Sequence, residues 1–189
     1  MIYVFSFKHK LPDDAIVIDV TSRSKSLGKQ FSPFLVGPVK LYGDYTAQNM
    51  ENAFQYSRVY TEYNGYDDRP TASYFEWARE GWNSKQPNKY PLGAWSRHLY
   101  HWWDGKKITD RIEAQNTIFV GPYAKAIVRT EAYRKLKKLY ETTDRDIYLL
   151  DFEGYDHRLF EMNWRQVMHH PTWAVGQGFV LAMLLEGYL

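Results

Sequence analysis

One short segment, Asn49 to Arg58, combines a carboxylate, an amide and a guanidinium at helical spacing. On a helix, Glu51, Gln55 and Arg58 would lie along one stripe, because residues three and four apart are neighbours on a helix surface. A carboxylate between a neutral amide and a cation can stay ionised in a partly buried site, where it can orient water or stabilise a developing oxocarbenium ion. The alternative is an exposed helix face, on which a Glu–Arg pair contributes about 0.5 kcal/mol or less.

Asp151 is a second candidate because it stands near the end of an apolar run, Ile147 to Phe152. The backbone at the end of a strand is rigid and therefore suits a catalytic group. An aspartate in this position can also cap the turn that follows the strand. The sequence leaves both interpretations open.

The histidines and serines carry no recognisable catalytic motif. His98 and His101 are three residues apart and His169 is followed by His170, but a metal site needs a third ligand and none is evident. No G-x-S-x-G motif marks a nucleophilic serine. We therefore expect neither a metal nor another cofactor.

Aromatic residues are abundant, with 7 Trp, 16 Tyr and 10 Phe that make up 17% of the chain. They are dense between Trp77 and Trp103, a stretch that includes Trp82 and Trp95. Such rings can stack on a purine, a flavin precursor or a nicotinamide, and they can equally close a core around irregular backbone.

The charge balance argues against a dedicated nucleic-acid binder. The chain has 24 basic and 22 acidic residues and a net charge of +2, without the basic excess that such proteins show. A nucleic-acid partner is possible but is not indicated by charge. The absence of cysteine excludes disulfides, zinc–thiolate sites and thiol nucleophiles. No apolar run is long enough to cross a bilayer and no basic leader opens the sequence, so we expect a cytoplasmic protein without a membrane partner.

The patterns of apolar residues and turn formers predict several short strands and helices. We expect strands over residues 2–7, 15–20, 117–120 and 147–152. We expect helices over 47–63 with Thr46 as its N-cap, over 71–80 with Thr71 as its N-cap, around 94–103, over 123–141 as one helix or two that meet near Thr130, and over 179–185. Short strands mixed with many helices predict an α+β fold: a single compact, mostly helical domain over residues 1–189 with a small mixed sheet.

Two segments together resemble a known family. Phe31-Ser32-Pro33-Phe34 and the run from Asn49 to Tyr60 are similar to the opening of NADAR proteins, a family that includes N-glycosidases acting on riboflavin-biosynthesis intermediates. Its members carry E-x-x-x-Q on a helix and a basic residue after it, positions that Glu51, Gln55 and Arg58 match here. The similarity is specific around residues 31–60. The family's usual W-G near its second Asp is absent.

The resemblance implies a NADAR-like fold that cleaves an N-glycosidic bond of a ribosyl-phosphate, a nucleotide or an ADP-ribosylated substrate. It implies that Glu51 is the catalytic carboxylate, in the manner of glycoside hydrolases, and that Asp151 contacts the ribose or shares the acid–base work. The residues expected to bind substrate are Asn49, Gln55, Arg58, Trp82 and Trp95.

Two other functions fit the same sequence. One is a non-catalytic nucleotide- or nucleic-acid-binding protein with an aromatic-walled pocket. The other is a structural interaction protein whose aromatic residues form an interface.

Overall fold

The computed structural model describes residues 1–189, and the chain divides into two units. Unit 1 consists of Met1–Ser32 and Tyr123–Leu189, and unit 2 of Pro33–Pro122. Both units contain helices and strands, so the predicted α+β class is confirmed. The expectation of a single domain over residues 1–189 stays a prediction. No helix has both the length and the apolar character that a membrane span requires.

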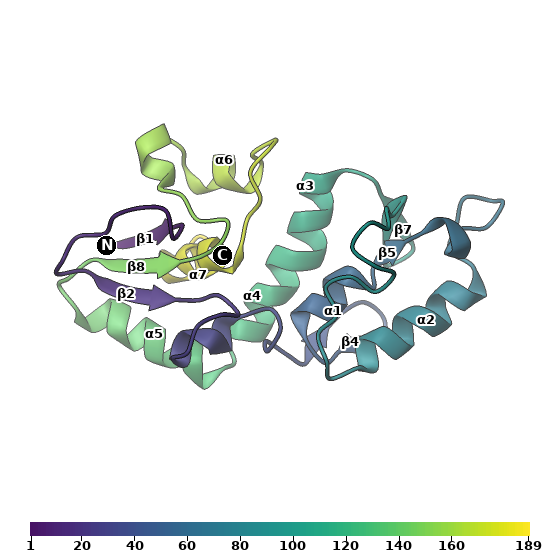
Figure 1. Ribbon diagram of the computed structural model, residues 1–189, viewed down its shortest axis with the longest axis horizontal. Helices are drawn as coiled ribbons and strands as arrows, with labels where there is room; N and C mark the ends of the chain where they lie inside the picture. Colours follow the sequence, from purple (N-terminus) through teal and green to yellow (C-terminus); the bar gives the residue numbers. More distant parts are fainter. The chain divides into compact units, whose positions relative to one another are not determined.

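The centre of unit 1 is a parallel sheet of three strands. These strands are β1 (Ile2–Phe5), β2 (Ile16–Asp19) and β8 (Ile147–Leu150). They are ordered β1-β8-β2 (Figure 1), and Ile147 on the middle strand faces Ile2 on one side and Ile16 on the other. The strands predicted near both ends of the chain are confirmed with slightly shorter bounds. Because all three are parallel, their carboxyl ends lie at the same edge of the sheet.

Helices complete unit 1. They are η1 (Leu27–Phe31), α4 (Gly121–Ile127, which begins in the last residues of unit 2), α5 (Glu131–Thr142), η4 (His157–Phe160), α6 (Trp164–Met168) and α7 (Gln177–Leu185). The predicted division near Thr130 is confirmed, because the Thr130 side chain accepts a hydrogen bond from the N–H of Tyr133 and caps α5. The apolar helix α7 is buried as predicted and packs against β1.

Unit 2 contains two small antiparallel sheets in place of one mixed sheet. Their strands are β3 (Val39–Lys40) with β4 (Thr46–Ala47), and β5 (Arg58–Val59), β6 (Tyr100–Trp103) and β7 (Lys106–Ile108). The helices are α1 (Met50–Gln55), η2 (Thr61–Tyr63), α2 (Ala72–Asn83), α3 (Arg111–Ala114) and the π-helix η3 (Gln115–Val120).

The helix predicted over residues 47–63 is wrong in its length. Helix α1 begins after Asn49, whose side chain accepts from the N–H of Asn52, while Thr46 belongs to β4. The helix ends at Gln55, and Arg58 pairs with β6 as part of strand β5. A long-range strand pairing therefore overrides the helical preference of the segment.

Three other predicted elements of the middle region need correction or extension. The helix expected around 94–103 is wrong, since Tyr100–Trp103 forms β6, in keeping with the preference of aromatic residues for strands. The strand expected over 117–120 lies in the π-helix η3. The helix capped by Thr71 is confirmed and continues through Gly81. A Cβ at Gly81 would lie 2.1 Å from the ring of Tyr56, so the glycine allows close packing there.

The core of unit 2 anchors helix α1. Trp103, Ile108, Ala114 and Ile118 form a buried cluster, against which the ring of Phe54 packs. Because Phe54 stands between Glu51 and Gln55 on α1, this contact fixes the helix that carries the candidate carboxylate.

Candidate functional site

Glu51 and Gln55 form a hydrogen-bonded pair on helix α1. The Gln55 amide donates from Nε2 to Oε1 of Glu51 at 2.9 Å, across one helical turn. Gln55 is 6% exposed and Glu51 is half-buried. The predicted relationship between these two side chains is confirmed, and the carboxylate has a fixed orientation.

Residues 33–36, at and just after the Phe31-Ser32-Pro33-Phe34 segment, hold the start of α1. The backbone N–H of Met50 donates to the carbonyl of Val36 at 2.8 Å, and the N–H of Glu51 donates to the carbonyl of Pro33 at 3.0 Å. The first N–H groups of a helix lack acceptors within the helix. Here the carbonyl groups of Pro33 and Val36 are the acceptors. Backbone hydrogen bonds therefore join residues 33–36 to the first turn of α1 within unit 2.

Arg58 reaches the site from a strand. It faces His101 across the β5–β6 pair, and directly opposed residues of antiparallel strands project from the same side of the sheet. Its guanidinium lies over the ring of Phe54, 5.4 Å from the ring centroid. The predicted helical stripe through Glu51, Gln55 and Arg58 is therefore wrong for Arg58, although packing on Phe54 still places it beside α1.

Burial dominates the electrostatics of Glu51. It raises the pKa of the Glu51 carboxyl, while the hydrogen bond from Gln55 and the charges of Lys89 and Arg58 lower it by less. No ion pair joins Glu51 to any cation. The carboxylate thus sits in a site that holds positive charge nearby without direct neutralisation. Lys89 was missed from the sequence, because it lies in an irregular loop with no spacing relation to Glu51.

Two polar atoms of the site are buried without a hydrogen-bond partner. They are Oε1 of Gln55 and Nε of Arg58. An unsatisfied buried polar atom costs on the order of 1–3 kcal/mol, and most such atoms in folded proteins are paired with protein or water. A polar ligand or a water molecule that bound beside Glu51 could pair with both atoms.

A buried serine–histidine contact lies next to Arg58. The Ser57 hydroxyl donates to the carbonyl of Phe54 at 2.7 Å, and its oxygen lies 2.8 Å from Nδ1 of His101. Because a hydroxyl has one proton, His101 donates from Nδ1 to Ser57, and its Nε2 is left as an acceptor. Burial, followed by the neighbouring His98 and Arg58, lowers the pKa of His101 to about 3. His101 is therefore neutral at pH 7, and Ser57 is a structural residue with no free proton to give to a base.

Asn52 organises the loop that carries Lys89. Its Nδ2 donates to the carbonyls of Ser84 at 3.0 Å and Gln86 at 2.9 Å, and its Oδ1 accepts from the N–H of Asn88 at 2.8 Å. Asn52 is fully buried. The sequence analysis assigned no role to Asn52. The only feature of the sequence that could have indicated one was its position directly after Glu51.

Asn49 has a structural task in this arrangement. It caps α1 through the N–H of Asn52, is 2% exposed, and lies 3.5 Å from the carbonyls of Ser84 and Lys85 through its Nδ2. Its role in substrate binding stays a prediction, and the observed contacts are those of a residue that holds α1 and the loop after α2 in place.

The two tryptophans expected to stack on the substrate occupy opposite environments. Trp82 is 1% exposed and packs against Tyr42 and Tyr45, whereas Trp95 is 96% exposed. The aromatic ring that contacts the candidate site is Phe54, with Phe119 at a centroid distance of 6.3 Å from it. The stacking role of both tryptophans stays a prediction.

Asp151 belongs to unit 1, where it caps helix α7. Its Oδ2 accepts from the N–H of Gly178 at 2.7 Å, and the side chain is 1% exposed. A Cβ at Gly176 would lie 2.4 Å from this oxygen, and one at Gly178 would lie 3.0 Å from it. The two glycines of Gly176-Gln177-Gly178 thus make room for the carboxylate. Burial raises the pKa of Asp151 to about 6 against the lowering effect of backbone N–H groups. These contacts support the capping interpretation, and the catalytic role stays a prediction.

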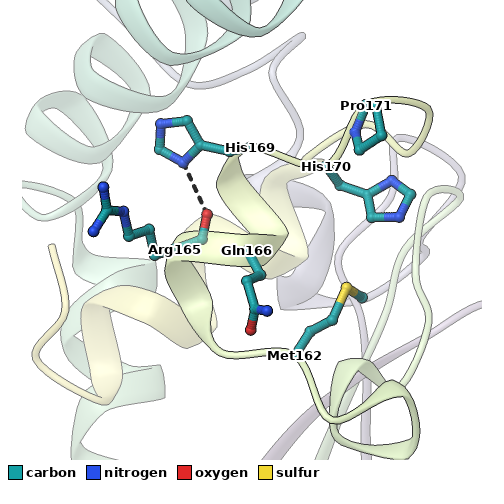
Figure 2. Close-up of a pocket in the computed structure, with 6 residues that line it drawn as sticks. All are labelled: Met162, Arg165, Gln166, His169, His170 and Pro171. Atoms are coloured by element: carbon teal, nitrogen blue, oxygen red, sulfur yellow. Dashed lines mark hydrogen bonds between the residues drawn. The ribbon is translucent and has the colours of Figure 1, made fainter.

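A surface pocket of about 530 Å³ lies along α6 in unit 1 (Figure 2). It is lined by Met162, Arg165, Gln166, His169, His170 and Pro171. His169 donates from Nδ1 to the carbonyl of Arg165 at 2.8 Å, which leaves its Nε2 as an acceptor. None of the predicted site residues lines this pocket. No group of three or more His, Asp or Glu side chains is placed to hold a metal ion, either here or at His98 and His101.

No protein-family model matches the sequence, and no curated protein matches it. The resemblance to NADAR proteins therefore rests on residues 31–60 alone.

Proposed function

We propose that the protein is an N-glycosyl hydrolase that cleaves an N-glycosidic bond of a ribosyl-phosphate, a nucleotide or an ADP-ribosylated substrate. The observation that carries the proposal is the half-buried Glu51 carboxylate, held by Gln55 and free of any ion pair. A cytoplasmic location, expected from the lack of cysteine, is part of the same proposal.

Glu51 acts as the proton acceptor. A water molecule attacks the anomeric carbon as its bond to the nitrogen of the base breaks, and Glu51 takes the proton that the water loses. Glu51 then gives this proton up to solvent, and solvent protonates the nitrogen of the leaving base, so that the water is consumed and the products are the sugar with a free hydroxyl and the free base. A raised pKa makes the ionised carboxylate a stronger base, and the fixed hydrogen bond from Gln55 keeps it oriented.

Arg58 binds the phosphate of the substrate. Its guanidinium is held by the Phe54 ring, and its unpaired Nε is one of several N–H groups that suit phosphate oxygens. Lys89 adds a second positive charge near Glu51. Because His101 stays neutral, it supplies hydrogen-bonding capacity without further charge.

The test is base release from a panel of nucleoside monophosphates, NAD⁺, ADP-ribosylated peptide and ribosylated pyrimidine phosphates, followed by chromatography. We expect release from at least one of these, and a loss of about 10²–10⁴-fold in rate for Glu51→Gln, the range typical of a general base. Glu62→Gln is the matched control, because Glu62 is an exposed glutamate in the same unit. Equal rates for Glu51→Gln and the parent would contradict the proposal.

A non-catalytic nucleotide-binding protein is the second candidate. The guanidinium of Arg58, which lies over the Phe54 ring, and the charge of Lys89 could also bind the phosphate of a nucleotide that is released unchanged. Saturable binding of a nucleotide without any free base, in the parent protein and in Glu51→Gln alike, would favour this candidate over the hydrolase.

A further inference from the structure

The carboxyl ends of the parallel strands in unit 1 carry a second set of ligand-binding groups. Strands β1, β8 and β2 run in the same direction, so the segments that follow them meet at one edge of the sheet. Open sheets of parallel strands commonly bind ligands at this edge. The segments in question contain residues 6–8, 21–23 and 152.

These segments form a pocket of about 310 Å³. It is lined by Ser6, Phe7, Lys8, Arg23 and Phe152. Phe7 is 52% exposed and Phe152 is 48% exposed, and their ring centroids are 5.8 Å apart at an interplanar angle of 39°. Two large rings that stay exposed side by side in a concave site are unusual on a protein surface and mark a place for an apolar or planar partner.

The same pocket is positively charged. The guanidinium of Arg23 lies over the Phe152 ring, 5.3 Å from its centroid, and Lys8 lines the pocket beside Phe7. Neither cation takes part in an ion pair, and no acidic side chain lines the pocket. The positive charge is therefore available to an anion.

Close packing after β8 fixes the two rings. A Cβ at Gly154 would lie 2.3 Å from the backbone of Phe5, and the N–H of Asp151 donates to the Phe5 carbonyl at 2.9 Å. Only a glycine permits this approach of the two chain segments. The approach in turn places Phe152 against Phe7.

A network of hydrogen bonds from Asp19 and Thr21 fixes the backbone at Arg23. Oδ1 of Asp19 accepts from the N–H of Thr21 at 2.9 Å and from its hydroxyl at 2.7 Å. The Thr21 oxygen then accepts from the N–H of Arg23 at 3.2 Å. The pocket is thus built before a ligand arrives, which lowers the entropic cost of binding.

We propose that this pocket binds a nucleoside monophosphate. The base stacks on the exposed ring of Phe7 and contacts Phe152, whose ring is tilted by 39° to it, so that two aromatic side chains bound the base. The phosphate is bound by Arg23 and Lys8, since guanidinium and ammonium groups form charge-assisted hydrogen bonds with phosphate oxygens. This site lies in unit 1 and does not rest on the function proposed for Glu51.

The test is a titration of ¹⁵N-labelled full-length protein with AMP, observed by two-dimensional NMR. We expect saturable shifts of the backbone amides of Phe7, Lys8, Arg23 and Phe152. Arg23→Gln weakens AMP binding about tenfold or more, as expected for the loss of a hydrogen bond to a charged group. Arg23 is exposed, so the variant keeps its fold, which the dispersion of the same spectra verifies.

Lys25→Gln is the matched control for Arg23→Gln. Lys25 is an exposed cation of the same loop that does not line the pocket, and its variant binds AMP like the parent. Adenosine and inorganic phosphate are used as separate probes. The affinity of each is expected to be lower than that of AMP by about tenfold or more. The readout is the unit 1 amides, and the titration is repeated in Glu51→Gln, so that any turnover of AMP at Glu51 does not affect the result.

Four results would overturn the proposal. AMP could leave these amides unshifted, or Arg23→Gln could bind AMP as tightly as Lys25→Gln. Inorganic phosphate that binds as tightly as AMP would exclude the stacking of a base. Phenyl phosphate that binds as tightly as AMP would exclude a nucleotide in favour of a single phosphorylated ring, such as that of a phosphotyrosine peptide.

Discussion

The carboxylate of Asp151 and the backbone N–H of Gly178 are joined by a hydrogen bond of 2.7 Å, across a sequence separation of 27 residues. The bond links the end of strand β8 to the first turn of helix α7, whose N-cap residue, Gly176, has no side chain to accept from the helix. A negative charge at the start of a helix is also favoured by the helix dipole. Asp151 therefore replaces the missing cap from a distant part of the chain.

Asp151 should give the folded protein a specific pH dependence. Burial raises the pKa of its carboxyl from 3.8 to about 6, so between pH 4 and pH 6 the folded state holds a proton that the unfolded state releases. The free energy of unfolding contributed by this group therefore falls as the pH rises through this window, by about 3 kcal/mol in total. Urea unfolding at half-unit pH steps measures it. The fall is expected to vanish in Asp151→Asn, and an unchanged slope in that variant would refute the assignment.

His101 should act in the opposite direction. Burial, with His98 and Arg58, lowers the pKa of His101 from 6.5 to about 3, so below pH 6.5 the unfolded state takes up a proton that the folded state does not. The free energy of unfolding then decreases as the pH falls, by up to about 1.4 kcal/mol per pH unit. His101→Asn keeps a donor for Ser57 and removes the titration. The same urea series should show a flatter acid limb for this variant, and a limb as steep as the parent's would argue against the prediction.

Glu51→Gln should separate catalysis from stability. Burial raises the pKa of Glu51 above its ordinary value of 4.5, so the free energy of unfolding falls as the pH rises from that value through the pKa in the folded state and stays lower above it. Replacement by a neutral amide of the same shape should therefore leave Tm at pH 7 equal to or above that of the parent, while turnover is lost. The gain in Tm should shrink as the pH is lowered toward 4. A drop in Tm at pH 7 would show that the ionised carboxylate stabilises the fold instead.

Arg58→Gln should affect only substrates that carry a phosphate. If the guanidinium binds phosphate, its loss raises KM for such a substrate about tenfold or more. The KM of the matched unphosphorylated nucleoside should change little. Arg69→Gln is a suitable control, because Arg69 is an exposed arginine of the same unit with no ring or acidic partner. A similar rise in KM for both substrates would exclude the phosphate role.

The relation between Glu51 and Gln55 could be predicted from the sequence because it depends only on helical geometry over one turn. The position of Arg58 could not, because its strand conformation depends on pairing with His101, which lies 43 residues further along the chain. Local preference alone favoured a continuous helix there. Arg58 still reaches the site, but by contact with Phe54 instead of by helical spacing.

The same distinction separates correct from wrong predictions elsewhere. The division into two helices near Thr130, one of the two alternatives left open, and the buried helix α7 follow from local patterns, and the structure shows both. Strand β6 and the loop held by Asn52 depend on distant partners, and neither was predicted. Asp151 was recognised as a residue at a strand end, but its partner at Gly178 has no local signal in the sequence.

The three hydrogen bonds of Asn52 have a consequence for the dynamics of unit 2. The amide of this side chain offers the loop at Ser84, Gln86 and Asn88 the same donor and acceptor that a neighbouring peptide group would offer. The loop therefore cannot detach while α1 remains in place, and the two segments open and close together as one cooperative unit. The amide proton of Asn88, in an exposed residue of an irregular loop, is consequently shielded from exchange with solvent as strongly as the helix on which it depends.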